Sequence, residues 1–193
     1  MKSLREAAAE CTACPLHESG TQTVFGAGPR KAEVMMVGEQ PGDREDIEGK
    51  PFVGPAGRVL GEALEHAGIE RGDVYVTNAV KHFKWEARGK RRIHQRPNAM
   101  EMRACRPWLE AELAVVKPQL VIALGAVAAR SLFGTKVRVT RDRGSPVESE
   151  VAPLAAVTVH PSSLLRIRED EERRFARAEF ERDVATAYSW LER

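Results

Sequence analysis

Four short apolar runs constrain the fold of this chain more than any other feature of its sequence. They lie at 33–37, 74–76, 120–124 and 155–159, and each is followed by small or polar residues. Nearly continuous apolar runs of this length are typical of strands buried on both faces of a parallel sheet. The sequence therefore predicts a central, mostly parallel sheet of four strands.

Segments with apolar residues at helical spacing separate these runs, and alternating strands and helices favour an α/β fold with helices on both faces of the sheet. The length of 193 residues suits one domain that spans 1–193. We expect an irregular basic segment at 81–97 and a hairpin within 134–150. The predicted helices are 1–9, 56–67, 98–116, 126–132 and 169–191.

The residues that follow the four predicted strands are candidates for a ligand-binding site. In open α/β sheets, ligands bind beyond the carboxyl ends of the strands. The segments at those ends are Gly38–Gly42, Thr77–Asn78, Gly125 and His160–Ser163. We expect these four segments to converge at one edge of the sheet.

Several side chains in these segments have chemistry suited to catalysis or recognition. A turn with two glycines and a proline presents Glu39, either as a positioned carboxylate or as an ordinary solvated residue. The Asn78 amide can read a carbonyl and a ring N–H together, or it can be a buried structural amide. His160 and Ser162 can contact a ligand or its phosphates, or His160 can cap the closing helix.

Two other segments have features suited to nucleic acid. The glycines of 51–58 allow the backbone to approach a phosphate at a helix N-terminus, and Phe52 can stack on a base or pack in the core. The most basic stretch, 90–97, has Phe83 and Trp85 just upstream. This composition suits a phosphate backbone, although a solvated loop has the same character.

Cys11, Cys14 and Cys105 are the three cysteines of the chain. In a reducing compartment, an odd number of cysteines with a C-x-x-C pair indicates a metal or cluster site, or no special role, rather than disulfides. His82 is the candidate fourth ligand, since it lies between the second strand and the helix that bears Cys105. His17 competes with it for this position.

The bulk properties limit the location and partners of the protein. The sequence contains no apolar run of membrane length and no signal peptide, so we expect a cytoplasmic protein without membrane contact. We also expect a monomer, because nothing in the sequence suggests a larger assembly. The formal net charge of +2 neither requires nor excludes nucleic acid, because local clustering of charge matters more than the total.

Four motifs lie in order along the chain: Gly38-Glu39-x-Pro41-Gly42, Pro51-Phe52-Val53-Gly54, Thr77-Asn78-x-Val80-Lys81 and His160-Pro161-Ser162. Together they resemble the iron–sulfur (family 4) uracil-DNA glycosylases. The basic loop Lys90–His94 is absent from the ordinary family pattern and looks like the inserted loop of the UdgX branch, which links covalently to uracil-containing DNA. Gln40 also fits that branch, and the resemblance extends from Cys11 to about Arg166.

The resemblance implies how uracil is recognised and released. Uracil must leave the duplex stack before chemistry can reach it, and Phe52 would stack on the extruded ring. Asn78 would bond to uracil O4 and N3–H, which rejects cytosine. His160 would donate to uracil O2 and stabilise the leaving anion, and Ser162 would belong to the substrate-binding set.

The resemblance also implies an unusual fate for the sugar. Glu39 would stabilise the positively charged sugar and orient or deprotonate His94, which would attack C1′ and remain attached. Arg92 would help hold the loop against the phosphates, and Gln40 would contribute to substrate binding. The outcome would be a single turnover with the protein bound covalently to DNA.

A [4Fe-4S] cluster is the cofactor that the resemblance implies. Family 4 enzymes use four cysteines, one of them just after the Asn-x-Val-Lys motif, where this chain has His82. The implied ligands are therefore Cys11, Cys14, Cys105 and His82.

Three other functions compete with covalent capture. The first is a conventional multi-turnover uracil-DNA glycosylase in which His94 only contacts DNA. The second is a non-catalytic iron–sulfur module that binds DNA. The third, a nucleotide-binding α/β protein, is disfavoured because no G-x-G-x-x-G or Walker loop follows any predicted strand.

Overall fold

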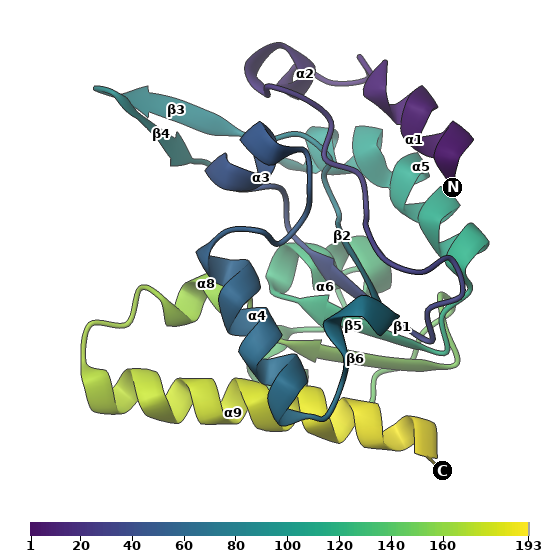
Figure 1. The fold of residues 1–193 in the computed structure, drawn as a ribbon, viewed down its shortest axis with the longest axis vertical. Helices are drawn as coiled ribbons and strands as arrows, with labels where there is room; N and C mark the ends of the chain where they lie inside the picture. The colour runs from purple at the N-terminus through teal and green to yellow at the C-terminus, as the bar shows by residue number, and fades with distance from the viewer. Residues whose placement is uncertain (193) are drawn as a thin grey trace.

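A four-stranded parallel sheet forms the centre of the computed structural model, which describes residues 1–192 (Figure 1). Its strands are β1 (Val34–Gly38), β2 (Val74–Asn78), β5 (Leu120–Leu124) and β6 (Leu154–Thr158), in the order β2-β1-β5-β6. All three strand pairings are parallel. This sheet confirms the α/β architecture that the four apolar runs predict.

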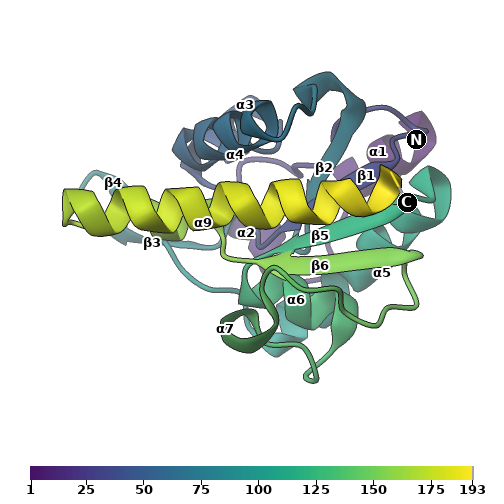
Figure 2. The same ribbon diagram turned by 90° about the horizontal axis from the view of Figure 1, so that it is seen from below.

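Helices cover both faces of the sheet, as predicted (Figure 2). On one face, α4 (Pro55–His66) and α9 (Asp170–Tyr188) pack against alternate strand residues such as Met36. On the other face, α5 (Ala99–Val116) and α6 (Ala126–Phe133) pack against the intervening residues. Because successive strand residues point to opposite faces, strands that are apolar at nearly every position can build two cores at once.

The remaining helices are short and lie mostly around the ends of the sheet. The long helix α5, by contrast, begins at the N-cap Asn98, whose side chain accepts hydrogen bonds from the Met100 and Glu101 backbone N–H groups. No helix within residues 1–192 has the length and apolar character to cross a membrane. The other helical elements are α1 (Lys2–Ala9), α2 (Leu16–Ser19), α3 (Asp43–Glu48), η1 (Arg71–Asp73), α7 (Val139–Asp142), α8 (Pro161–Leu164) and η2 (Ser189–Glu192).

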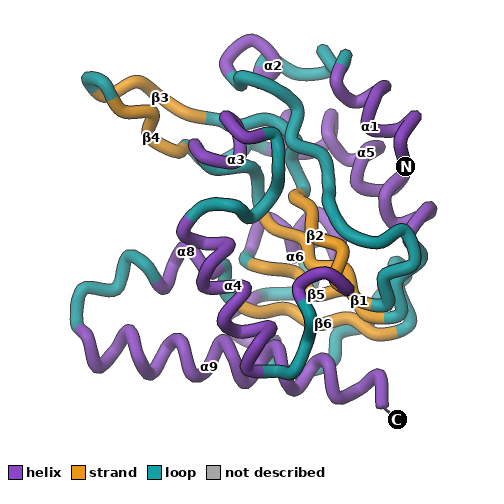
Figure 3. The backbone as a smooth tube through the Cα atoms, viewed as in Figure 1, coloured by secondary structure: helices purple, strands orange, loops and turns teal. Residues whose placement is uncertain are grey.

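Two expectations about local structure are wrong. The segment predicted to be irregular contains an antiparallel hairpin of β3 (Trp85–Arg88) and β4 (Arg91–His94), which projects from the body of the molecule (Figure 3). Within the fully described segment 134–150, the predicted hairpin is replaced by α7 and one isolated bridge from Pro146 to β6. In both places, contacts with distant segments decide the structure.

Candidate active site

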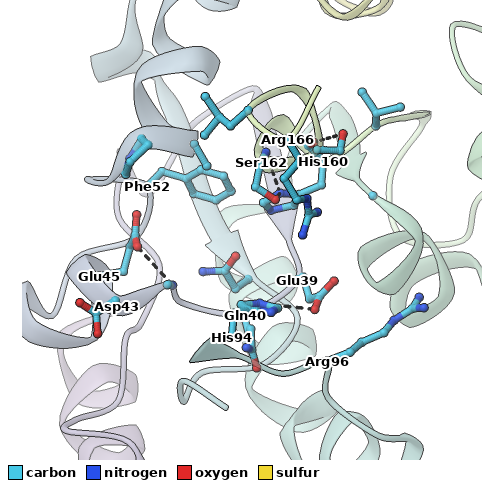
Figure 4. Close-up of a pocket in the computed structure, with 18 of the residues that line it drawn as sticks. Glu39, Gln40, Asp43, Glu45, Phe52, His94, Arg96, His160, Ser162 and Arg166 are labelled. Atoms are coloured by element: carbon cyan, nitrogen blue, oxygen red, sulfur yellow. Dashed lines mark hydrogen bonds and ion pairs between the residues drawn. The ribbon is translucent and has the colours of Figure 1, made fainter. Parts of the chain in front are cut away.

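A cleft of about 960 Å³ opens at the carboxyl ends of the four strands (Figure 4). Its lining includes residues from all four segments that follow the strands, so the predicted convergence is confirmed. Seven of the residues singled out for catalysis or substrate binding line the cleft, and Arg92 is the exception. The seven are Glu39, Gln40, Phe52, Asn78, His94, His160 and Ser162.

Phe52 and His160 form one wall of the cleft. Their ring centroids are 6.2 Å apart and the ring planes differ by 28°. Phe52 has a φ of 56°, a left-handed conformation that is strained for an aromatic residue. A side chain at Gly38 would collide with Phe52, because its Cβ would lie 2.7 Å from Phe52 Cζ. The glycine therefore leaves room for an aromatic ring at the end of β1.

Asn78 lies at the floor of the cleft and is almost completely buried. It ends β2 opposite Gly38, and a Cβ at Gly38 would come within 2.4 Å of Asn78 Oδ1. The Gly38 position thus makes space for both the amide and the Phe52 ring. A confined amide of this kind can offer one donor and one acceptor in a fixed direction.

His160 is positioned as a neutral hydrogen-bond donor. Its Nδ1 accepts from the Ser162 backbone N–H at 3.2 Å and lies 2.8 Å from the Ser162 hydroxyl. Burial lowers the pKa of His160 to about 4, assisted by the nearby His94 and Arg166. Because Nδ1 accepts, the ring proton of the neutral form is on Nε2. Ser162 therefore orients His160, in addition to lining the cleft.

Glu39 presents a partly buried carboxylate on the opposite side of the cleft from Phe52 (Figure 4). Burial raises the pKa of Glu39, while the charges of Arg96 and Arg166 act in the opposite direction. Among the described residues, its buried Oε1 atom accepts no hydrogen bond. An unpartnered carboxylate oxygen facing a cleft is suited to a cationic group or a proton donor.

His94, at the end of β4, brings a second histidine to the cleft. Its Nε2 lies 3.6 Å from Glu39 Oε1, and this pair joins the hairpin to the turn after β1. Burial lowers the pKa of His94, and Arg166 lowers it further. The imidazole is consequently neutral near pH 7 and keeps a lone pair on one nitrogen.

Gln40 anchors the base of this hairpin. Its Nε2 donates to the backbone oxygens of Lys84 and Gln95 at 3.1 and 3.0 Å, and its Oε1 accepts from Lys84 N at 3.2 Å. The sequence led us to expect Gln40 to bind substrate. Its amide is directed to backbone groups that flank β3 and β4, and it thereby supports the position of His94. Gln40 also lines the cleft, and its contact with substrate stays a prediction.

Arg92 also holds the hairpin and does not line the cleft. Its Nε donates to Asp43 Oδ1 and its Nη1 to Asp46 Oδ2, both at 2.6 Å. The guanidinium also lies over the rings of Phe83 and Trp85, 5.4 and 5.5 Å from the centroids. These contacts differ from the expected phosphate contact, because the guanidinium is directed to two carboxylates of α3.

Five further charged residues line the cleft, although none of them was assigned a role in the site from the sequence: Asp43, Arg44, Glu45, Arg96 and Arg166. Glu45 Oε1 accepts from the Gly54 backbone N–H at 2.7 Å, and Oε2 accepts from Gly42 N at 3.2 Å. It therefore ties the turn that bears Glu39 to the turn that bears Phe52. The spacing of Gly42 and Glu45 at the start of α3 was an available signal for this contact.

The cysteine region lies away from the cleft. Cys14 and Cys105 share a small core with Leu16 and Val80, and Trp108 packs at its edge. The Trp108 indole N–H donates to Cys11 Sγ at 3.2 Å, and the Lys81 backbone N–H donates to Cys105 Sγ at 3.1 Å. Burial raises the pKa of Cys105 to about 11, and the Lys81 charge opposes this shift. Within residues 1–192, no three His, Cys, Asp or Glu side chains are grouped closely enough to hold one metal ion.

Both histidine candidates lie near the cysteine region. His82 is buried, and its Nε2 is 2.9 Å from the Thr23 hydroxyl. His17 Nδ1 lies 2.7 Å from the Cys14 backbone oxygen. Burial lowers the pKa of His82, and the neighbouring His17 lowers it further.

Comparison with known proteins identifies the family. Residues 25–185 match the model of the uracil DNA glycosylase superfamily. The type-4 uracil-DNA glycosylase of Thermotoga maritima is 39% identical over 184 residues, covering 94% of this chain and 92% of the relative. That of Pyrobaculum aerophilum is 36% identical over 192 residues, covering 96% and 91%. That of Archaeoglobus fulgidus is 33% identical over 175 residues, covering 86% and 84%. This chain therefore belongs to the uracil DNA glycosylase superfamily, together with the type-4 uracil-DNA glycosylases.

Proposed function

We propose that this uracil-DNA glycosylase releases uracil from DNA and then remains bonded to the deoxyribose through His94. The observation that carries the proposal is the 3.6 Å approach of His94 Nε2 to Glu39 Oε1 at the edge of the cleft. A neutral imidazole beside a carboxylate is the arrangement that activates a nitrogen nucleophile. Two separate anchors, Gln40 and Arg92, support the position of His94.

Recognition of uracil depends on Phe52 and Asn78 in this proposal. The extruded ring stacks on Phe52, and the Asn78 amide bonds to O4 and N3–H of uracil. Cytosine presents a donor at position 4 and an acceptor at N3, so the same amide orientation leaves polar groups unpaired. Each buried mismatch of this kind costs about 1–3 kcal/mol.

Departure of uracil depends on His160 and Glu39. The C1′–N1 bond breaks and its electron pair leaves on uracil, while His160 Nε2–H donates to O2 and stabilises the anion. The low pKa of His160 supports a neutral donor in this role. The Glu39 carboxylate stabilises the positive charge that develops on the sugar.

Capture of the sugar depends on His94. The lone pair of its imidazole forms a bond to C1′, and the ring then loses its N–H proton to Glu39 or to water. Uracil takes up a proton in turn, so atoms and charge balance over the whole reaction. The lowered pKa of His94 supports this step, because only the neutral ring has a free lone pair.

We further propose that Cys11, Cys14 and Cys105 hold a [4Fe-4S] cluster with His82, or with His17 as the competing fourth ligand. Two N–H groups directed at cysteine sulfurs support this assignment, because hydrogen bonds to sulfur are typical around cluster thiolates. The ligands of a four-iron cluster also stand farther apart than those of a single ion. When bound, the cluster supplies structural support to the DNA-binding surface.

The number of uracils released per protein molecule tests the proposal. Covalent capture predicts that wild-type protein stops after about one uracil per molecule, whereas His94→Ser continues to release uracil because water replaces the imidazole. His66→Ser is the matched control, since His66 is an exposed histidine on α4. Continued turnover by the wild-type protein would instead establish a conventional glycosylase in which His94 only contacts DNA.

A further inference from the structure

A network of four polar side chains is buried between β2 and α5. Its members are Tyr75, Thr77, Lys81 and Glu112, and the exposed fraction of each residue is 0%. The Lys81 ammonium and the Glu112 carboxylate form an ion pair of 2.5 Å at its centre. None of these four residues lines the cleft, as far as the described residues show, and the proposed reaction uses none of them.

Every polar atom of the ion pair has partners. The three ammonium protons of Lys81 are directed to Glu112 Oε2, to the Asn78 backbone oxygen at 2.6 Å and to the Thr77 hydroxyl at 2.7 Å. Glu112 Oε1 accepts from Gly26 N at 2.8 Å and from the Tyr75 hydroxyl at 2.9 Å. Thr77 donates to Glu112 Oε2 at 2.8 Å. All hydrogen-bonding groups of the ion pair are therefore satisfied, and they are satisfied in a single arrangement of the four side chains.

An ion pair in this position needs an explanation beyond stability. Removing two charges from water costs several kcal/mol per ion, and apolar residues of similar volume are often as stable or more stable. Buried polar groups do fix one geometry in several proteins, because each hydrogen bond restricts its partners. The group that Lys81 restricts, apart from its two side-chain partners, is the backbone oxygen of Asn78.

The segment around Asn78 is also connected to the turn that bears Glu39. Ala79 N donates to the Gly38 oxygen at 2.9 Å, and Val80 N donates to the Glu39 oxygen at 3.0 Å. A displacement of the Asn78 carbonyl would therefore move both the amide of Asn78 and the backbone of Glu39. The amide packs against the end of β1 where only a glycine fits, since any side chain at Gly38 would collide with its Oδ1.

We propose that Glu112 is a positioning residue for uracil recognition, which acts by holding Lys81 on the carbonyl of Asn78. The inference rests on the proposed role of Asn78 as the residue that reads uracil. Glu112 touches neither substrate nor reacting atoms in this proposal. From its position on α5, on the far side of β2, Glu112 fixes the direction of the Asn78 amide.

A double-mutant cycle with Glu112→Gln and Asn78→Ala tests the inference. Each variant is compared by its single-turnover rate of uracil release, with folding checked by circular dichroism. We expect Glu112→Gln alone to slow release at least about tenfold, which corresponds to one lost hydrogen bond of about 1.4 kcal/mol. In the Asn78→Ala background, the same substitution has little further effect, because the amide it positions is gone.

If the two substitutions slow uracil release by factors that multiply in the double variant, the inference is overturned, because Glu112 then acts independently of Asn78. If Asn78→Ala releases uracil at the wild-type rate, the role of Asn78 fails and the inference fails with it. Glu110→Gln is the matched control, since Glu110 lies exposed on the same helix and pairs with Arg106. If Glu112→Gln does not fold, Tyr75→Phe takes its place in the cycle, since it removes one contact of the carboxylate.

An apolar replacement of the pair, Lys81→Met with Glu112→Leu, separates positioning from stability. Its melting temperature reports what the pair contributes to stability, because the removal of two desolvated charges is opposed by the loss of the acceptor for Gly26 N and the Tyr75 hydroxyl. Its rate of uracil release still falls at least about tenfold, because the Asn78 carbonyl loses its donor. A stable variant that releases uracil at the wild-type rate would overturn the inference.

Discussion

His94 Nε2 lies 3.6 Å from Glu39 Oε1, although the two residues are separated by most of the β1–β4 segment. The distance exceeds that of a normal hydrogen bond, and the Glu39 oxygen has no other partner among the described residues. Both groups also face the cleft.

Replacing Glu39 with glutamine tests the electrostatic part of this arrangement. An amide keeps the shape of the side chain but cannot stabilise positive charge on the sugar. We expect the rate of uracil release to fall about 10²–10³-fold, the range seen when one preorganised electrostatic group is removed. The rate is measured in a single turnover with excess protein. Glu48→Gln, an exposed residue at the end of α3, serves as the control and keeps the wild-type rate.

The rate of covalent capture has a predictable dependence on pH. Because burial and Arg166 lower the pKa of His94 below 6.5, the reactive neutral ring predominates at pH 7. The rate therefore falls only as the pH drops through this lowered pKa. Arg166→Gln removes a positive charge and raises the pKa of both His94 and Glu39, so the acid limb moves to higher pH.

The control for this pH profile is Arg168→Gln, which changes an exposed arginine two residues away. Loss of the Arg168 charge weakens any contact with phosphates, but it leaves the midpoint of the acid limb unchanged. An unchanged midpoint in Arg166→Gln would contradict the assigned electrostatic role of Arg166.

The anchoring of the hairpin by Arg92 predicts a loss of capture that exceeds the loss of uracil release. Arg92→Ala removes the contacts to Asp43 and Asp46, so His94 is less often in position when the sugar cation forms. We expect the captured fraction to fall on the order of tenfold, since hydrogen bonds between charged groups contribute about 1.5–3 kcal/mol. Both products are measured from the same reaction. Arg91→Ala, the exposed neighbour, keeps the wild-type ratio of capture to release.

The identity of the fourth cluster ligand can be decided by iron content. His82→Ala is expected to lose iron and sulfide together with the visible absorbance of the cluster, and His17→Ala is expected to retain them. The reverse result would assign the position to His17. Cys105→Ser should lose the cluster in either case, and iron bound at the wild-type level in this variant would contradict a cluster at this site.

The central sheet and the site segments at its edge could be predicted from sequence for a physical reason. Strands buried on both faces are marked by local composition, and parallel strands present their carboxyl ends at one edge. Glu39 and His160 come after such strands and Asn78 ends one, so their convergence required no knowledge of side-chain contacts.

The hairpin and its anchors could not be predicted in the same way. Trp85–Arg88 and Arg91–His94 are short, charged strands whose local sequence resembles a solvated loop. Their pairing is stabilised by Gln40 and by the carboxylates that bind Arg92, which are more than 40 positions away in sequence. For this reason the anchoring of the hairpin by Gln40 and Arg92 could not be predicted from the local sequence.

The most direct test of the account is a denaturing gel of the protein mixed with a labelled oligonucleotide that contains uracil. The account predicts a band of lower mobility that survives boiling in detergent, is absent with thymine, and yields an adduct on the peptide containing His94. His94→Ser should give no such band but should leave alkali-labile sites in the DNA. Release of uracil by the wild-type protein without any shifted band would contradict covalent capture and leave an ordinary glycosylase.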